Sequence, residues 1–169
     1  MLTHKGTQLI LTERLTLRRF TLGDAQAMFD NWASDERVTR YLTWTPHRSL
    51  ELTNQLLENW CAAYANPGTY NWVIEYKGKA IGISDKHEYA DLGYCMGFDY
   101  WNQGIMTEAA KAVINYLFDE IGVNRVGISH AVKNPASGRV AQKCGLTYEG
   151  TKREYYKTET GEFLDISDY

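Results

Sequence analysis

Apolar residues recur along the chain with two spacings, which predict an alternation of strands and helices. In the first part of the chain, residues 15–19 alternate between apolar and polar and predict a short strand. The apolar positions within 25–32 and 49–66 fall at helical spacing, and Pro67-Gly68 ends the second of these helices. The aromatic stretch 41–47 is then expected to be a loop between helices.

Three strand-like runs follow, at residues 70–76, 79–85 and 92–98. Lys77-Gly78 predicts a tight hairpin between the first two, so the three runs are expected to form an antiparallel meander. The most complete helical pattern covers 107–121, and Gly122 ends it.

The last part of the chain continues the alternation. Residues 125–132 predict a strand, 135–143 a short helix, and 148–156 with 163–169 a closing hairpin. Strand and helix alternating after a meander predict an α/β (α+β) fold with a mixed sheet and helices packed on it.

Composition narrows the class of protein. The 169 residues, 44% of them hydrophobic and 23% charged, are expected to form one globular domain over 1–169. The net charge of -3 gives no overall attraction for nucleic acid or anionic lipid. No apolar run approaches the ~18 residues of a membrane span, and the first residues lack an export pattern, so a cytoplasmic protein is expected.

Cysteine and histidine spacing does not predict a metal site. Cys61, Cys95 and Cys144 are widely separated and are interpreted as reduced core thiols. The four histidines form no ligand spacing, and His47 and His87 are expected to be plain surface residues.

The most informative segment is 101–109, which joins a predicted strand to the longest helix. A helix start leaves backbone N–H groups unpaired and carries partial positive charge, which suits a phosphate. Gly104 lets the backbone approach such a ligand, and the Thr107 hydroxyl adds a donor. An equally good interpretation is a tight turn without a ligand, since the segment matches neither a Walker loop nor a dinucleotide fingerprint.

Several ordered motifs make a family resemblance specific. Together they resemble the GCN5-related N-acetyltransferase (GNAT) superfamily, within it the RimJ/RimL-type branch that acetylates the N-termini of ribosomal proteins. The segments are Thr12-Glu13-Arg14-Leu15-Thr16-Leu17-Arg18, Leu92-Gly93-Tyr94-Cys95-Met96, Tyr100-Trp101-Asn102-Gln103-Gly104-Ile105-Met106-Thr107-Glu108-Ala109, Asn134-Pro135-Ala136-Ser137, Lys143-Cys144-Gly145-Leu146 and Tyr148-Glu149-Gly150.

The resemblance implies a fold and an activity. The fold is a mixed, mostly antiparallel sheet of six to seven strands, splayed after the fourth strand and flanked by about four helices. The activity is transfer of an acetyl group from acetyl-CoA to a primary amine, either a protein N-terminal α-amine or a small amine, by direct attack in a ternary complex. The acetyl-CoA is a cosubstrate, no metal is involved, and a homodimer is a further expectation.

The resemblance also implies a cofactor site. The backbone of Tyr94, Cys95 and Met96 would pair with the pantetheine arm, as an added strand does. The amides of Trp101, Asn102, Gln103, Gly104, Ile105, Met106 and Thr107 would hold the pyrophosphate, and Asn134 would contact the arm. Two residues depart from the family pattern and could narrow the phosphate loop: Met106 replaces the usual Gly or Ala, and Asn102 replaces the branch's Gly.

Catalytic residues are less well defined. The Met96 N–H is a candidate for stabilising the oxyanion, and Ser137 a candidate proton donor for the departing thiolate; the competing interpretation of Ser137 is a helix residue bonded to backbone. Tyr156 falls where ribosomal-protein members have a glutamate base.

Other groups could accept the proton of the amine. Glu154, two residues before Tyr156, would share its strand face if period-two alternation holds. Glu88, Asp91 and a water chain are alternatives, and Glu108 is interpreted as a partner of the helix dipole. Because the expected glutamate is missing, a non-catalytic acyl-CoA-binding regulatory module is the alternative to an enzyme.

Overall fold

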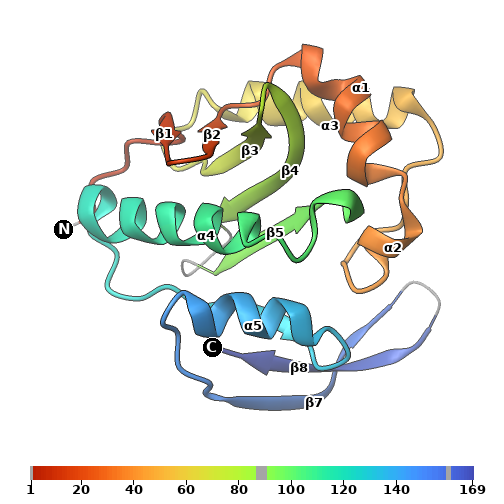
Figure 1. Ribbon diagram of the computed structural model, residues 1–169, viewed down its shortest axis with the longest axis vertical. Helices are drawn as coiled ribbons and strands as arrows, with labels where there is room; N and C mark the ends of the chain where they lie inside the picture. The colour runs from red at the N-terminus through yellow and green to blue at the C-terminus, as the bar shows by residue number, and fades with distance from the viewer. Residues whose placement is uncertain (1, 87–90, 159–160) are drawn as a thin grey trace.

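Two antiparallel sheets organise the computed structural model, which describes residues 2–86, 91–158 and 161–169 (Figure 1). The larger sheet has the strand order β1-β2-β3-β4-β5, formed by Ile10–Leu11, Leu15–Arg18, Asn71–Tyr76, Lys79–Lys86 and Leu92–Met96. The smaller sheet has the order β6-β8-β7, formed by Ser129–Ala131, Phe163–Asp168 and Gly150–Lys157. The α-helices are α1 (Ala25–Met28), α2 (Glu36–Thr39), α3 (Leu50–Ala63), α4 (Ile105–Tyr116) and α5 (Pro135–Lys143).

The larger sheet is covered on both faces because its central strands are apolar on both sides. Trp72 and Ile74 of β3 are fully buried in a cluster that includes the inward face of α4. Val73, between them, points to the opposite face and joins a second cluster with residues of α1 and α3. No helix in the described part of the chain is long and apolar enough to cross a membrane.

Two predicted helices are confirmed in extent, but each changes its winding near its end. α1 continues as a wider π-type turn over Phe29–Ala33, and α4 continues in the same way over Leu117–Ile121. Gly122 then ends the second helix with a φ of +77°. α4 also begins at Ile105, two residues before the predicted start.

The sequence patterns missed the short elements β1 and α2 and overextended several strands, most of all the one predicted over 125–132. β1 has two residues and α2 has four, which is too short for a periodicity to be recognised. The strand predicted over 125–132 is reduced to Ser129–Ala131, because the chain before it forms only an isolated bridge to the larger sheet.

The two sheets separate directly after one contact. Asp91 and Gly127 form a parallel bridge, and the Leu92 N–H donates to the Gly127 carbonyl at 2.8 Å. Beyond this point β5 stays in the larger sheet, whereas β6 pairs with β8. The predicted splay is therefore confirmed, after the strand counted fourth from the sequence, which is β5 here because β1 precedes the others.

Gly82 provides a test of how closely β4 and β5 approach. A Cβ on this residue would lie 2.5 Å from the Cys95 carbonyl oxygen and 2.9 Å from the Met96 Cα, and both are backbone atoms that a rotamer change cannot move. We expect Gly82→Ala to lower the free energy of unfolding by about 1–3 kcal/mol, measured by urea denaturation. Gly23→Ala is the control, since its Cβ would meet only the Thr21 Oγ1 at 3.6 Å. Equal effects of the two variants would contradict this.

Candidate functional site

β5 carries an edge that faces away from β4. The Gly97 N–H donates to the Ile81 carbonyl at 2.9 Å, which identifies these two residues as a hydrogen-bonded pair of the antiparallel ladder. Because such pairs alternate along two antiparallel strands, Cys95 also bonds to β4, whereas the backbone groups of Tyr94 and Met96 point to the opposite side. That side is where the larger sheet ends.

Two of the groups on this edge have partners. The Leu92 N–H reaches Gly127, as described above, and the Met96 carbonyl accepts a hydrogen bond from the Trp101 indole at 2.7 Å. Within the described residues, no hydrogen bond is formed by the N–H or carbonyl of Tyr94 or by the N–H of Met96. Tyr94 and Met96 therefore offer two donors and one acceptor to an extended ligand, in the spacing of a strand.

The side chains of β5 are divided between the two faces of the sheet. Met96 is buried in the cluster below α4, and Tyr94 packs against the same cluster. Cys95 is buried on the opposite face, where burial raises the pKa of its thiol, so that the thiol stays protonated. Cys61 and Cys144 are half-buried, and all three cysteines are free thiols.

The turn between β5 and α4 has two residues in the left-handed region of backbone conformation. Asn102 has a φ of +60° and Gly104, at the N-cap of α4, a φ of +74°. Asparagine and glycine adopt this region more readily than other residues, so both positions carry a residue that suits the turn. In the described part of the chain, no residue accepts a hydrogen bond from a backbone N–H of residues 102–107.

The first residues of α4 anchor this turn to the core. Ile105 is fully buried and Met106 is 7% exposed, both in the cluster against β2 and β3. The Met106 side chain thus points into the protein and does not narrow the turn. The Gln103 side chain donates to the Asp99 carbonyl at 2.9 Å and holds the turn from its outer side.

A charged network ties the N-terminal part of the chain to the same turn. Arg14 Nε donates to Glu108 Oε2 at 2.6 Å, and Arg14 Nη1 donates to the Gln103 carbonyl at 3.0 Å. Thr12 Oγ1 donates to Glu108 Oε1 at 2.6 Å, and the Arg14 N–H donates to the same oxygen at 3.0 Å. Burial raises the pKa of Glu108, but the hydrogen bonds from Thr12 and Arg14 outweigh it and leave the pKa lowered.

The sequence interpretation missed Thr12 and Arg14 as part of this network. Both occur in the first motif of the family resemblance, and Glu108 occurs in the third, so the signal was the joint presence of an arginine and a carboxylate in motifs about 90 residues apart. Glu108 therefore does more than complement the helix dipole.

The start of α5 faces the open edge of β5. The Tyr94 hydroxyl lies 2.9 Å from Ser137 Oγ and 3.1 Å from the Ser137 carbonyl oxygen. Burial raises the pKa of Tyr94 to about 12. Asn134 caps the helix through its carbonyl, which accepts the Ser137 N–H at 3.2 Å, and its side chain makes no hydrogen bond to another described residue. The structure thus brings Tyr94, Asn134 and Ser137 together across the splay.

The candidate bases Glu154 and Tyr156 are not hydrogen-bonded to Tyr94 or Ser137. β7 shifts register between Lys152 and Tyr156, and within this bulge Glu154 has a φ of +47°. The alternation that would place Glu154 and Tyr156 on one face is therefore interrupted. Glu154 and Asp91 are exposed, Tyr156 is half-buried, and Glu88 lies outside the described residues, as does His87.

His47 is buried, so the expectation of a surface histidine was wrong for it. Its Nδ1 lies 2.8 Å from Thr53 Oγ1, and its ring packs against Trp44 at 5.4 Å between centroids. Burial lowers its pKa. The predicted aromatic loop therefore folds inward against α3.

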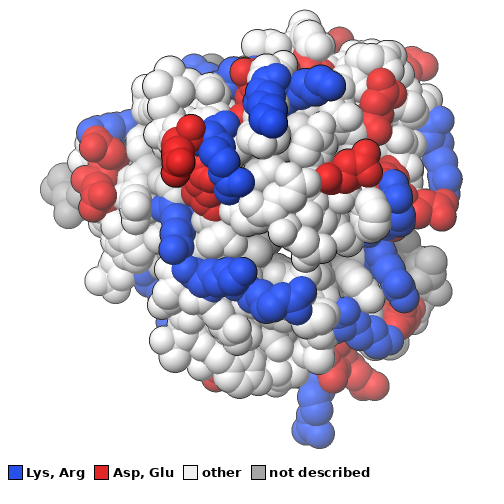
Figure 2. Space-filling model, in the orientation of Figure 1, with Lys and Arg blue, Asp and Glu red and all other residues white. Residues whose placement is uncertain are grey.

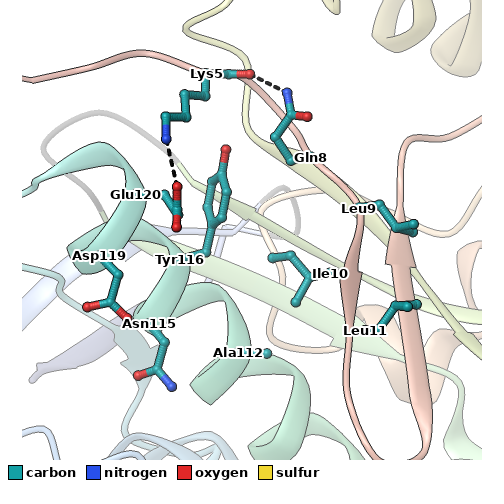
Figure 3. A pocket seen from close by; sticks show the side chains of 10 residues that line it. All are labelled: Lys5, Gln8, Leu9, Ile10, Leu11, Ala112, Asn115, Tyr116, Asp119 and Glu120. Atoms are coloured by element: carbon teal, nitrogen blue, oxygen red, sulfur yellow. Dashed lines mark hydrogen bonds and ion pairs between the residues drawn. The ribbon is translucent and has the colours of Figure 1, made fainter.

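Charge and shape add two features of the surface. Figure 2 shows lysine and arginine side chains in a band across the face on which α4 and α5 lie. Lys111 of α4 and Arg139 and Lys143 of α5 are exposed. A shallow groove of about 840 Å³ lies elsewhere, between β1 and the outer side of α4 (Figure 3). Leu9, Tyr116 and Glu120 are among its lining residues, and none of the predicted site residues lines it.

Comparison with known proteins assigns the family. Residues 14–147 match the Acetyltransferase (GNAT) domain family. The uncharacterized N-acetyltransferase YoaA of Bacillus subtilis is 32% identical over 152 residues, which cover 85% of each chain. The putative ribosomal N-acetyltransferase YdaF of Bacillus subtilis is 26% identical over 153 residues, covering 85% of this chain and 84% of that protein.

One solved structure shows the same fold. RimL, a ribosomal-protein alpha-N-acetyltransferase in complex with coenzyme A, superposes with a TM-score of 0.85 over 96% of each chain, at 20% identity. The family match and the relatives named as N-acetyltransferases identify an acyltransferase enzyme, rather than the binding-only module that the missing glutamate suggested. The chain belongs to the GNAT acetyltransferase family, and its relatives are consistent with the RimJ/RimL-type branch.

Removing the charge of Glu108 tests the network around the turn. Because its folded pKa is lowered, Glu108 stabilises the fold above the ordinary glutamate value of ~4.3, and this contribution is lost as the pH falls through the folded pKa. We expect Glu108→Gln to lower the free energy of unfolding by about 1 kcal/mol at pH 7 and by progressively less toward pH 3.5, in urea titrations. Glu51→Gln, at an exposed glutamate in the first turn of α3, is the control. A pH-independent loss would contradict the assignment.

Proposed function

We propose that the protein transfers the acetyl group of acetyl-CoA to a primary amine by direct attack in a ternary complex, and that of the two expected acceptors, a protein N-terminal α-amine and a small amine, it uses the α-amine. The observation that carries the proposal is the free edge of β5 next to the unpaired amides before α4. The free edge suits an extended arm that contains amide groups, and the unpaired amides suit a diphosphate.

The cofactor residues follow from which backbone groups are free. The N–H and carbonyl of Tyr94 pair with the pantetheine arm, and the N–H of Met96 faces the acetyl group at the end of that arm. Cys95 does not take part, because its backbone groups face β4. The free Asn134 side chain contacts the arm from the other side of the splay.

The proposed phosphate site has one amide fewer than the sequence predicted. The Trp101 N–H donates to the Phe98 carbonyl at 3.1 Å, so the cradle consists of the amides from Asn102 to Thr107. The positive band that includes the surfaces of α4 and α5 attracts a ligand with several phosphates, despite the net charge of -3.

The reaction requires a neutral amine, an oxyanion donor and a route for one proton. The Met96 N–H, which faces the open edge, stabilises the oxyanion, and Ser137 gives a proton to the departing thiolate. The structure holds neither Glu154 nor Tyr156 in a network with Ser137.

The lack of a well-held base favours an acceptor that does not need one. An α-amine with a pKa near ~8 is neutral in roughly a tenth of molecules at pH 7, whereas a lysine near ~10.4 is almost wholly charged. Water can therefore accept the proton of an α-amine. The names of YdaF and RimL, which both describe acetylation of ribosomal proteins, support a protein N-terminus as the acceptor.

A turnover assay tests the acceptor. Free thiol is followed with acetyl-CoA and three acceptors: a short peptide with a free N-terminus, the same peptide with a blocked N-terminus and one lysine, and a polyamine. We expect turnover only with the free N-terminus, at a rate that rises with pH up to about 8. Preference for the blocked peptide or the polyamine would refute the α-amine, and binding of acetyl-CoA without any turnover would refute the enzyme.

A bulky residue at the phosphate turn tests the cofactor site. We expect Gly104→Trp to weaken binding of coenzyme A about tenfold or more, or ~1.4 kcal/mol, in a calorimetric titration, because the side chain occupies space beside the free amides. Gly122→Trp is the matched control, since Gly122 has a φ of +77° at the other end of the same helical segment, against +74° for Gly104. Equal affinity of the two variants would refute the site.

A further inference from the structure

Ser137 can protonate the departing thiolate only if its hydroxyl hydrogen points toward the sulfur. A serine hydroxyl has one hydrogen and rotates freely, so its direction depends on the groups around the oxygen. In this protein Ser137 Oγ lies 2.9 Å from the hydroxyl of Tyr94. That contact therefore decides where the serine hydrogen can point.

The Tyr94 hydroxyl has two acceptors on the same residue. One is the Ser137 carbonyl at 3.1 Å, which can only accept, and the other is Ser137 Oγ, which can donate or accept. When the tyrosine donates to the carbonyl, the serine hydrogen can point back at the tyrosine oxygen. When the tyrosine donates to Oγ, the serine hydrogen is directed away from Tyr94.

The position of Tyr94 and Ser137 in the fold shows which group the serine hydrogen can reach when the tyrosine donates to Oγ. Tyr94 belongs to β5 and Ser137 to the first turn of α5, on the two sides of the splay. The backbone of Tyr94 also contributes to the free strand edge described above. A hydrogen on Ser137 that turns away from Tyr94 is therefore available to a ligand lying along that edge.

We propose that Tyr94 is a positioning residue for the transfer reaction, because its hydroxyl donates to Ser137 Oγ and so aims the serine hydrogen at the sulfur of the cofactor. The inference rests on the proposed function. As the carbon–sulfur bond breaks, its electron pair goes to sulfur, which takes the proton of Ser137. The proton that the nitrogen loses on forming the amide replaces it on Oγ, and the serine ends as it began.

Tyr94 keeps its own proton through this sequence. Its pKa is raised to about 12 by burial, so the phenol remains neutral at the pH at which the amine reacts. The tyrosine acts through Ser137 and donates a hydrogen bond, which strengthens as Oγ gains negative charge in the transition state. Its ring packs against the core, a role that phenylalanine can also fill.

The test removes only the tyrosine oxygen. We expect Tyr94→Phe to lower kcat about 5- to 20-fold, less than the 10²–10⁴-fold of a complete proton-transfer step, with KM for acetyl-CoA and the affinity for coenzyme A within about twofold of wild type. Ser137→Ala should lower kcat at least as much. The double variant should be no slower than Ser137→Ala, because Tyr94 acts through that hydroxyl.

Tyr116→Phe separates this effect from a loss of stability. The Tyr116 hydroxyl also donates to a backbone carbonyl, that of Gly6 at 2.7 Å, and its ring packs against the same core. We expect this variant to be less stable with an unchanged kcat.

Three results would overturn the inference. The first is a Tyr94→Phe variant with wild-type kcat, and the second is a double variant whose losses multiply, which would show that Tyr94 acts independently of Ser137. Either leaves the proposed function intact. A wild-type protein that binds no coenzyme A and shows no turnover would overturn the proposed function, and this inference with it.

Discussion

The separation of β5 from β6 is the constraint on which the rest of the site depends. Backbone N–H and carbonyl groups require partners, and a strand edge without them is a template for another extended chain. The larger sheet would be continuous if β6 paired along β5, but the contact ends after Leu92 and Gly127. Beyond it β6 is paired with β8, so the Tyr94 and Met96 groups have no strand to bond to.

The close contact at the start of the splay shows how the divergence is fixed. A Cβ on Gly127 would lie 2.6 Å from Asp91 Oδ1 and 3.4 Å from the Tyr169 carbonyl oxygen, so a side chain here would require the Asp91 carboxylate to move. From this point the sheets part, and α5 follows β6 and faces the edge of β5. The site is consequently assembled from the N-terminal Thr12 and Arg14, from the segment between β5 and α4, and from the start of α5.

Much of this architecture could be predicted from the sequence, where long elements carry a clear period. The pattern of α4, the meander of β3 to β5 and the final hairpin are examples, and the turn at Gly104 was recognised as the informative segment. The rest depends on tertiary contacts. The sequence predicts a loop residue at His47, but contacts with Trp44 and Thr53 bury it. Glu154 looks like a strand residue until a φ of +47° and a bond from its N–H to the Asp165 carboxylate break the alternation.

The contact between the hydroxyls of Tyr94 and Ser137 also could not be predicted from the sequence. The motif resemblance assigned Tyr94 a role through its backbone and Ser137 a role through its side chain, and the two residues are 43 positions apart. Only the packing of α5 against the open edge makes the two hydroxyls neighbours. Under the proposed function, this contact would let one residue bind the arm through its backbone and orient the Ser137 hydrogen through its side chain.

The division between backbone and side-chain roles also indicates where specificity is encoded. The groups assigned to the cofactor are mostly backbone amides and carbonyls, which many sequences can present, and the fold is retained at 20% identity with a TM-score of 0.85. The family match ends at residue 147, before β7 begins at Gly150. The closing hairpin, with its bulge at Glu154, lies beyond that matched segment, and it carries both Glu154 and Tyr156, the candidate bases whose alternation the bulge interrupts.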